Sequence, residues 1–255
     1  MLWLWLVACR VVDAPENIEE LMTFGFVQHG AADSSWPTAF ATNLLPELDS
    51  HAEELEKGYR VGSLLPEDIA EAGFESTAEG EVAGVAATSA LASSPAEVVA
   101  VLSLPDITPV FSSSESYELK EHSDRDCFLA GECEFYTYSF RRSIDLGILG
   151  SVTQDALGSF RRLTLEDGTE VVLWQTAAPD PGEVTGGLMT VQQQYSEDLF
   201  FPAEGGGTGR ATAMWLDAQL VDSDLPDSFL ISTSVSSLGK ANGELDAFVE
   251  AGGLD

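Results

Sequence analysis

The segment SPAEVVAVLSLPDITPVF, residues 94–111, constrains the fold more than any other part of the chain. It starts a helix firmly, because a serine N-cap is followed by Pro95 at the first helical position and by Glu97 at the capping-box position. Pro105 ends this helix, and Asp106 can cap a second short one. Two such short helices bury too little apolar surface to form a core. They are therefore expected to close a structure that the rest of the chain builds.

Alternating segments surround this helix pair, and a long helical segment ends the chain. Asp167-Gly168 predicts the tight turn of a β-hairpin, because both residues tolerate positive φ. The final segment has apolar residues at helical spacing. The predicted strands lie in residues 81–92, 117–122, 134–142, 163–174 (the hairpin), 188–200 and 209–220, and the helix in 225–251. The order of one strand, two short helices, about six antiparallel strands and one long helix predicts an α+β fold.

The N-terminal quarter of the chain has a helical pattern instead. Three helices are expected, beginning near Asp13, spanning residues 43–59 and spanning residues 63–72. The polar stretch EAGFESTAEGE separates this part from the strands. Residues 10–78 are therefore predicted to form a tether and a helical extension.

The first nine residues, MLWLWLVAC, are apolar up to a cysteine. Residues 6–9, LVAC, resemble a bacterial lipobox, which implies that residues 1–9 are a lipoprotein signal segment and that Cys9 carries the lipid. A short buried N-terminal segment is the alternative interpretation. With the lipobox, the expected location is the bacterial cell envelope, with a lipid anchor in the membrane and the domain facing the periplasm or the cell surface.

The charge balance excludes one large class of partners. The chain has 43 acidic and 11 basic residues and a formal charge of −32. Too few Lys and Arg residues are present to neutralise phosphates, so nucleic-acid binding is not expected. The acidic residues are scattered, which favours a solvated surface over an acidic binding site.

The cysteines and histidines indicate a disulfide rather than a metal site. Cys127 and Cys133 form an even pair in the sequence CFLAGEC once Cys9 is set aside, and an exported protein folds in an oxidising compartment. The three histidines are scattered, and no CxxC or HExxH spacing occurs. A disulfide is therefore predicted, and no metal or other cofactor is expected.

The order and the residues of four segments resemble the START-related helix-grip superfamily, which includes lipid-transfer domains and polyketide-cyclase-like (SRPBCC) proteins. The resemblance implies a domain at residues 79–255 in which a curved antiparallel sheet of about seven strands surrounds the C-terminal helix. A cavity for an apolar ligand would lie between sheet and helix, and the short helix pair would plug the open end. Ser123-Asp124-Arg125-Asp126 lies too early to be the charged cavity pair of the lipid-transfer branch and is interpreted as a solvated turn. The four segments are residues 81–111, LEDGTEVVLWQTA at 165–177, GTGRATAMWLDAQL at 207–220, and 225–252.

The leading functional hypothesis is a monomeric carrier for a lipid or another apolar small molecule. A sheet and a helix that do not pack fully against each other leave an apolar pocket, which is the usual ligand site. Each large apolar residue can equally be ordinary core. The candidate lining residues are Tyr138, Phe160, Trp174, Met189, Met214, Phe229 and Leu238.

Two other classes of function stay open. An enzyme of the cyclase or hydrolase type would need titratable groups in the cavity, such as Arg210, Asp217 or Glu170 together with Tyr138. No GxSxG or P-loop motif occurs, and the catalytic residues stay unknown. A surface lipoprotein with a filled core that acts through protein partners is the third possibility.

Overall fold

A computed structural model describes residues 13–32, 35–75, 80–165, 167–187, 189–220, 223–224 and 227–254. The lipobox and Cys9 lie outside the described residues. The helices are α1 (Ile18–Gln28), α2 (Trp36–Ser50), α3 (Ala52–Leu55), α4 (Pro66–Glu71), α5 (Pro95–Leu102), α6 (Arg125–Leu129) and α7 (Asp227–Glu250), with a 3₁₀ turn η1 (Gly147–Leu149). The strands are β1 (Tyr59–Leu64), β2 (Val82–Leu91), β3 (Ser114–Glu121), β4 (Phe135–Asp145), β5 (Ser151–Thr164), β6 (Glu170–Ala178), β7 (Glu183–Thr185), β8 (Met189–Pro202), β9 (Thr208–Leu220) and β10 (Ser223–Asp224).

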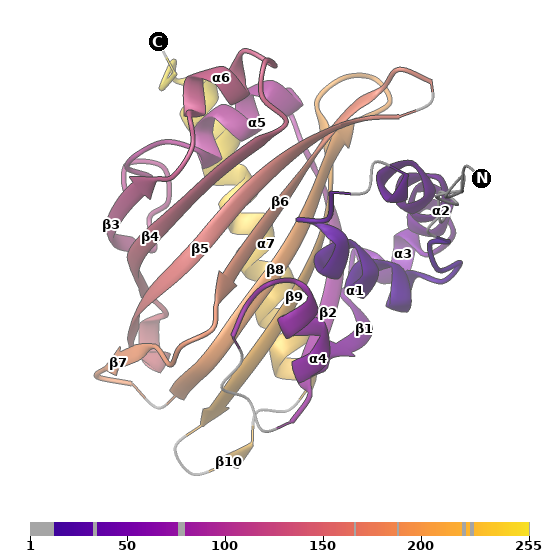
Figure 1. Ribbon diagram of the computed structural model, residues 1–255. Helices are drawn as coiled ribbons and strands as arrows, with labels where there is room; N and C mark the ends of the chain where they lie inside the picture. The colour runs from indigo at the N-terminus through magenta and orange to yellow at the C-terminus, as the bar shows by residue number, and fades with distance from the viewer. Residues whose placement is uncertain are drawn as a thin grey trace, which may run out of the picture.

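In the described part of the chain, the strands form one curved antiparallel sheet in the order β1-β2-β9-β8-β6-β5-β4-β3. The short strands β7 and β10 pair with β5 and β9 at its rim. Figure 1 shows α7 crossing one side of this sheet and α1–α4 lying on the other. The predicted α+β helix-grip class is confirmed. The sheet has more strands than the seven expected, because β1, β7 and β10 are too short or too irregular to show a clear period.

Successive residues of each strand point to opposite sides, so the sheet has two buried faces. We call the side under α7 the helix face and the side under α1–α4 the extension face. Tyr138 and Phe160 lie in the cluster on the helix face, together with Leu245 of α7. Leu173 and Trp215 lie in the cluster on the extension face.

The N-terminal extension is not wholly helical as expected. The helix predicted at residues 43–59 starts earlier, at Trp36, and ends at Ser50. Residues 59–64 form β1, which pairs antiparallel with β2 and buries Val61 and Leu64. The hydrogen bonds that β2 offers along its free edge outweigh the weak helical pattern of this short segment. The helix expected at 63–72 is shortened to α4.

The predicted start of a helix at Ser94 and its end before Pro105 are confirmed by α5. Ser94 caps α5, since its N–H donates to Glu97 Oε2 at 2.8 Å while Glu97 N–H donates to the Ser94 hydroxyl at 3.4 Å. The second predicted helix is a single turn, in which Phe111 N–H donates to the Ile107 carbonyl at 3.2 Å. Val98 and Val101 are fully buried in the cluster that includes Leu245 of α7, so α5 closes one end of the helix face (Figure 1).

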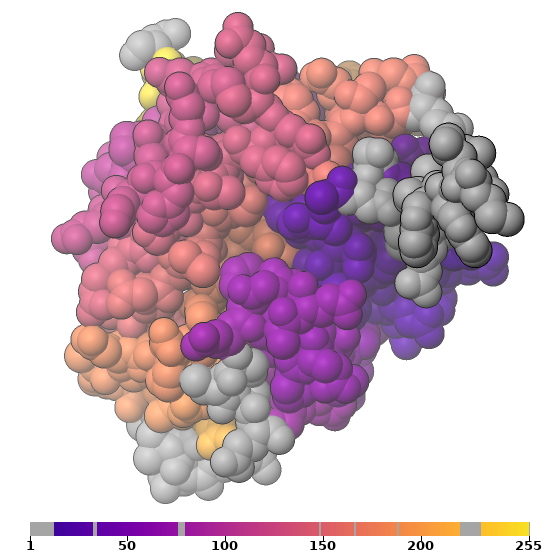
Figure 2. Space-filling model, viewed as in Figure 1, coloured from indigo at the N-terminus to yellow at the C-terminus, as the bar shows by residue number. Residues whose placement is uncertain are grey.

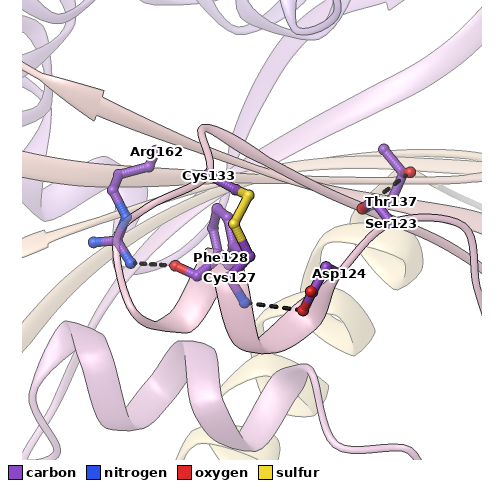
Figure 3. The surroundings of a disulfide bond; sticks show 7 residues. All are labelled: Ser123, Asp124, Cys127, Phe128, Cys133, Thr137 and Arg162. Atoms are coloured by element: carbon purple, nitrogen blue, oxygen red, sulfur yellow. Dashed lines mark hydrogen bonds between the residues drawn. A yellow bond between two sulfur atoms is a disulfide. The ribbon is translucent and has the colours of Figure 1, made fainter.

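The predicted disulfide joins Cys127 and Cys133, whose Cα atoms are 5.4 Å apart (Figure 3). It closes the loop around α6, and Arg162 of β5 donates to the Phe128 carbonyl at 3.1 Å inside that loop. The loop is therefore fixed both covalently and to the sheet.

The interpretation of Asp124, Arg125 and Asp126 as a solvated turn holds only in part, because Asp124 and Asp126 are exposed but Arg125 begins a helix and is largely buried. Asp124 caps α6 by accepting a hydrogen bond from Cys127 N–H at 3.0 Å. Arg125 donates to the carbonyls of Ser103 at 2.7 Å and Ala100 at 3.0 Å. These carbonyls belong to the end of α5, so Arg125 satisfies the unpaired groups of a helix C-terminus and fastens α6 to α5.

Candidate ligand-binding site

A row of aromatic rings crosses the middle of the helix face. Tyr138 and Phe160 are stacked with centroids 6.0 Å apart, and Phe160 lies parallel to Trp174 at 5.4 Å. Trp174 Nε1–H donates to the Tyr138 hydroxyl oxygen at 2.8 Å. Burial raises the pKa of Tyr138 well above its usual value, so its hydroxyl keeps its proton. The Tyr138 hydroxyl thus accepts from Trp174 and still has a hydrogen to donate.

Gly158 makes room for this row. A Cβ atom at this position would lie 2.3 Å from Cζ of Tyr138, because the tyrosine ring lies over the backbone of the neighbouring strand β5. The glycine is thus needed for close approach rather than for an unusual backbone angle.

A buried polar network fastens the C-terminal half of α7 to the helix face. Arg210 of β9 donates to Asp198 of β8 at 2.8 Å and to the Asn242 side-chain oxygen at 2.7 Å. Thr212 also donates to Asp198, and Asn242 donates to Ser89 at 2.7 Å. Every charge in this network has a partner of the opposite sign, which is what burial of ions requires.

Asp246 makes a second fastening one turn further along α7. Its carboxylate accepts hydrogen bonds from Ala92 N–H at 2.9 Å, from Ser93 N–H at 3.0 Å and from the Ser93 hydroxyl at 2.7 Å. Burial raises the pKa of Asp246, but the three hydrogen bonds outweigh it and hold the pKa below its usual value. The helix is therefore held to β2 and to the loop before α5.

A hollow of about 50 Å³ lies under the N-terminal half of α7. It is mostly apolar and holds only a few water molecules at this volume. Its walls come from β1, β2, β8, β9 and α7. The lining residues are Arg60, Ala83, Gly84, Val85, Gln194, Met214, Leu216, Ile231 and Ser234.

Arg142 of β4 lies on the helix face next to this hollow. Its Nη2 donates to the Oε1 of Gln194 at 3.3 Å, and Gln194 also lines the hollow. The guanidinium lies 5.5 Å from the centre of the Phe140 ring. Its Nε is buried and has no hydrogen-bond partner. Burial lowers the pKa of Arg142, and among the described residues no carboxylate forms an ion pair with it.

Further hydrogen-bond donors surround Arg142. Gln154 of β5 is its direct neighbour in the sheet, is 4% exposed, and has an Nε2 without a partner. Tyr117 of β3 is its neighbour on the other side, and burial raises the pKa of the Tyr117 hydroxyl so that it stays protonated. Three side chains from adjacent strands thus present donors to one region of the helix face.

The extension face is fastened by a different polar group. His29, which follows α1, has its Nδ1 3.0 Å from Glu197 Oε1 and its Nε2 3.1 Å from the Ser159 hydroxyl, both within hydrogen-bond distance. Arg161 donates to the carbonyls of His29 at 2.8 Å and Ala31 at 3.0 Å and pairs with Glu134 at 2.8 Å. Burial raises the pKa of Glu197, and the neighbouring His29 opposes part of that rise.

Ser159, His29 and Glu197 contact one another in the same succession as the hydroxyl, imidazole and carboxylate of a serine-hydrolase triad. The surroundings of Ser159, however, differ from those of a catalytic serine. Ser159 lies in the interior of β5, paired with Thr137 on one side and Gln175 on the other. The backbone N–H groups around it belong to the sheet ladders and are not free to bind an oxyanion. We therefore assign this group to fastening the extension onto the sheet.

A larger but open hollow, of about 590 Å³, lies on the part of the sheet that the extension leaves uncovered, over β3, β4 and β5. Figure 2 shows these strands as a surface beside the extension. Arg141, one of its lining residues, is paired with Asp155 at 2.5 Å and with Glu183 at 3.1 Å. Arg141 thus has two carboxylate partners, whereas no described carboxylate pairs with Arg142.

The structure brings several of the predicted lining residues together. Tyr138, Phe160 and Trp174 form the aromatic row, and Met214 lines the hollow. Leu238 of α7 is 7% exposed. Met189 packs instead with Val152 and Val191 in a small separate cluster. The side chain of Phe229 lies outside the described residues.

The groups that an enzyme would need are not gathered. Arg210 is paired with Asp198 on the helix face, whereas Glu170 forms an exposed pair with Arg162 at 3.3 Å. Asp217 is seven residues after Arg210 on the same strand, so the alternation of β9 points it to the opposite face.

Sequence reasoning missed Arg142, Gln154 and Gln194. The alternation that places Tyr136, Tyr138 and Phe140 on one side of β4 also places Arg142 there, so this residue had a signal. The glutamines had none, because their place beside Arg142 depends on the pairing of β4, β5, β6 and β8.

Among the described residues, no helix is both long and apolar enough to cross a bilayer, and no group of histidine, cysteine and acidic side chains could hold a metal ion.

No protein-family model and no curated protein matches this chain, but solved structures do. The STAR-related lipid transfer protein of Xanthomonas axonopodis is 15% identical over 64% of this chain and 86% of its own, with a TM-score of 0.40. Human StAR-related lipid transfer protein 5 is 13% identical over 68% and 76%, with a TM-score of 0.42. The di-domain ARO/CYC StfQ of steffimycin biosynthesis is 14% identical over 64% and 44%, with a TM-score of 0.36. The expected resemblance to the START-like helix-grip superfamily is confirmed at the level of the fold, which rests on the topology of the chain itself.

Proposed function

We propose that this protein is a binding or carrier protein for a lipid or another apolar small molecule, tethered to the bacterial cell envelope through Cys9. The observation that carries the proposal is the hollow under α7 together with the aromatic row and the unpartnered donors beside it. In a completed core, side chains would fill the hollow and acceptors would pair with these donors.

The hollow is too small for a lipid as it stands, so binding requires part of α7 to move. The hydrogen bonds through Asn242 and Asp246 hold the C-terminal half of α7. Over the hollow, Ile231 and Ser234 are only half-buried. The N-terminal half of α7 is therefore the part that would swing away from the sheet to admit a ligand.

The first test is native mass spectrometry of the chain without residues 1–9, purified from its own envelope and compared with its denatured mass. The expected result is excess mass that extracts into organic solvent. A clean apo mass that does not shift with added lipids would contradict the carrier function and favour the enzyme or the interaction protein.

The tether has its own test. Metabolic labelling with an alkyne fatty acid is expected to label the full chain and not its Cys9→Ser variant. Equal labelling of the two proteins, or none of either, would overturn the tether without bearing on ligand binding.

A further inference from the structure

Two arginines lie on the helix face with their charges balanced differently. Arg210 is buried, whereas Arg142 is half-buried as a whole with a buried Nε atom. Arg210 contacts Asp198 at 2.8 Å and donates a second hydrogen bond to Asn242, so its charge is balanced inside the protein. Within the described part of the chain, the one hydrogen bond of Arg142 goes to the amide oxygen of Gln194, at the long distance of 3.3 Å, and its other contact is the face of the Phe140 ring. A chain with 43 acidic residues could readily supply a carboxylate here, and among the described residues none does.

A buried donor without an acceptor, on a cation that no described carboxylate balances, costs free energy that a bound anion would recover. The donors around it show what kind of partner fits. Arg142 Nε and Gln154 Nε2 are buried donors without acceptors, and the Tyr138 hydroxyl has a hydrogen left after accepting from Trp174. Such a group of donors matches an oxygen-rich acceptor.

We propose that the ligand is an amphiphile with a carboxylate head group, which binds Arg142 and Gln154 while its apolar part lies along Trp174 and in the hollow. This inference rests on the proposed carrier function. A single carboxylate balances the single guanidinium charge of Arg142, whereas a phosphate monoester would bring a second negative charge to the same donors.

The geometry also places the two ends of the ligand. Gln194 faces both parts of the site, because its Oε1 accepts from Arg142 while its side chain lines the hollow with Met214 and Leu216. A carboxylate that binds side-on to Nε and Nη2 would displace Gln194 Oε1 from Nη2. The apolar chain would then continue past Gln194 toward Met214.

The test compares two probes of equal length, hexadecanoate and hexadecan-1-ol, delivered from cyclodextrin and measured by native mass spectrometry. The wild-type chain is expected to bind the acid roughly ten- to hundredfold more tightly than the alcohol, as charge-assisted hydrogen bonds allow. Arg142→Gln is expected to lose this preference and to bind the alcohol as the wild type does.

Arg141→Gln is the matched control, because Arg141 is the next residue along β4 and points to the other face, where it pairs with Asp155. It is expected to keep the preference for the acid. Gln154→Leu, which removes an unpartnered donor at similar size, is expected to reduce the preference by a smaller factor than Arg142→Gln.

A measurement without ligand guards against a variant that merely misfolds. If only a bound anion balances the charge of Arg142, this residue does not stabilise the ligand-free protein. The ligand-free Arg142→Gln variant should then melt at the same temperature as the ligand-free wild type or higher. A clearly lower melting temperature would show that Arg142 has a structural partner and would overturn the inference.

The outcomes separate this inference from the carrier function. Equal binding of acid and alcohol by the wild type, or an unchanged preference in Arg142→Gln, would overturn the carboxylate site and leave apolar binding standing. Binding of neither probe, together with a clean apo mass from the envelope, would overturn both.

Discussion

Helices lie on both faces of the sheet, but they are packed and fastened differently on each. On the extension face, Arg161 pairs with Glu134, His29 contacts Glu197, and aromatic side chains fill the space between strands and helices. Its buried polar groups are not all paired, since Glu197 Oε2 and Trp36 Nε1 have no hydrogen-bond partner. On the helix face, α7 is fastened at one end, a hollow remains at the other, and Arg142 has no carboxylate. The difference agrees with the proposed function, in which the extension face contributes stability and the helix face binds the ligand.

Glu197 and Asp198 are adjacent on β8 and point to opposite faces, Glu197 to the extension face and Asp198 to the helix face. A change at Asp198 therefore tests the helix face alone. Asp198→Ala would leave Arg210 buried without its partner, and such losses cost about 3–5 kcal/mol. Chemical denaturation should show this loss. A loss below about 1 kcal/mol would mean that Arg210 reaches water when Asp198 is absent.

Arg161→Ala tests the fastening of the extension. It removes hydrogen bonds to the carbonyls of His29 and Ala31, and we expect a loss of about 2–3 kcal/mol. Hydrogen exchange should rise in α1 and α2 and not in α7. Equal increases on both faces would show that the two cores unfold together.

The acidic groups of the two faces should respond to pH in opposite directions. Glu197 has a raised pKa, so its contribution is fully present below its unfolded value of 4.5 and is lost as the pH rises through the folded pKa. Asp246 has a lowered pKa, so its contribution is present above 3.8 and is lost as the pH falls through the folded pKa.

These signs can be read from two variants in denaturation curves from about pH 3 to pH 8. Glu197→Gln should remove part of the decline in stability toward high pH. Asp246→Asn should remove part of the decline toward low pH. Parallel curves for both variants and the wild type would contradict the assignment.

The smallest expected effect concerns α7 itself. Gly239 and Gly243 are exposed on this helix, and a Cβ atom at either position meets nothing within 4 Å. Alanine at each should raise stability by about 0.5–1 kcal/mol through helix propensity. Thermal unfolding measures this gain, and a loss would mean that α7 needs these glycines to bend.

The sequence predicts those parts of the fold that depend on neighbouring residues. The capping box at Ser94, the turn at Asp167-Gly168 and the long C-terminal helix are local signals, and the structure contains all three. The aromatic row is predicted because alternation along one strand places Tyr138 on a buried face. β1 could not be predicted in the same way, because it is held by its pairing with β2.

The candidate site is harder to predict for the same reason. Arg142 and Gln154 become neighbours only through the register of β4 with β5, and Gln194 reaches them from β8, on the far side of β6. Arg142 is informative because no described carboxylate pairs with it, and the sequence of one strand cannot show this.

The two edges of the sheet bear on the solubility of the protein at high concentration. At one edge, β1 covers β2 but is itself short and irregular between Val61 and Leu64, which makes it a poor template for another strand. At the other edge, β3 carries the charged sequence SESYELKE with mostly exposed side chains. A second copy that approached either edge would meet a broken ladder or like charges, so this chain is protected from edge-to-edge aggregation at both ends of its sheet.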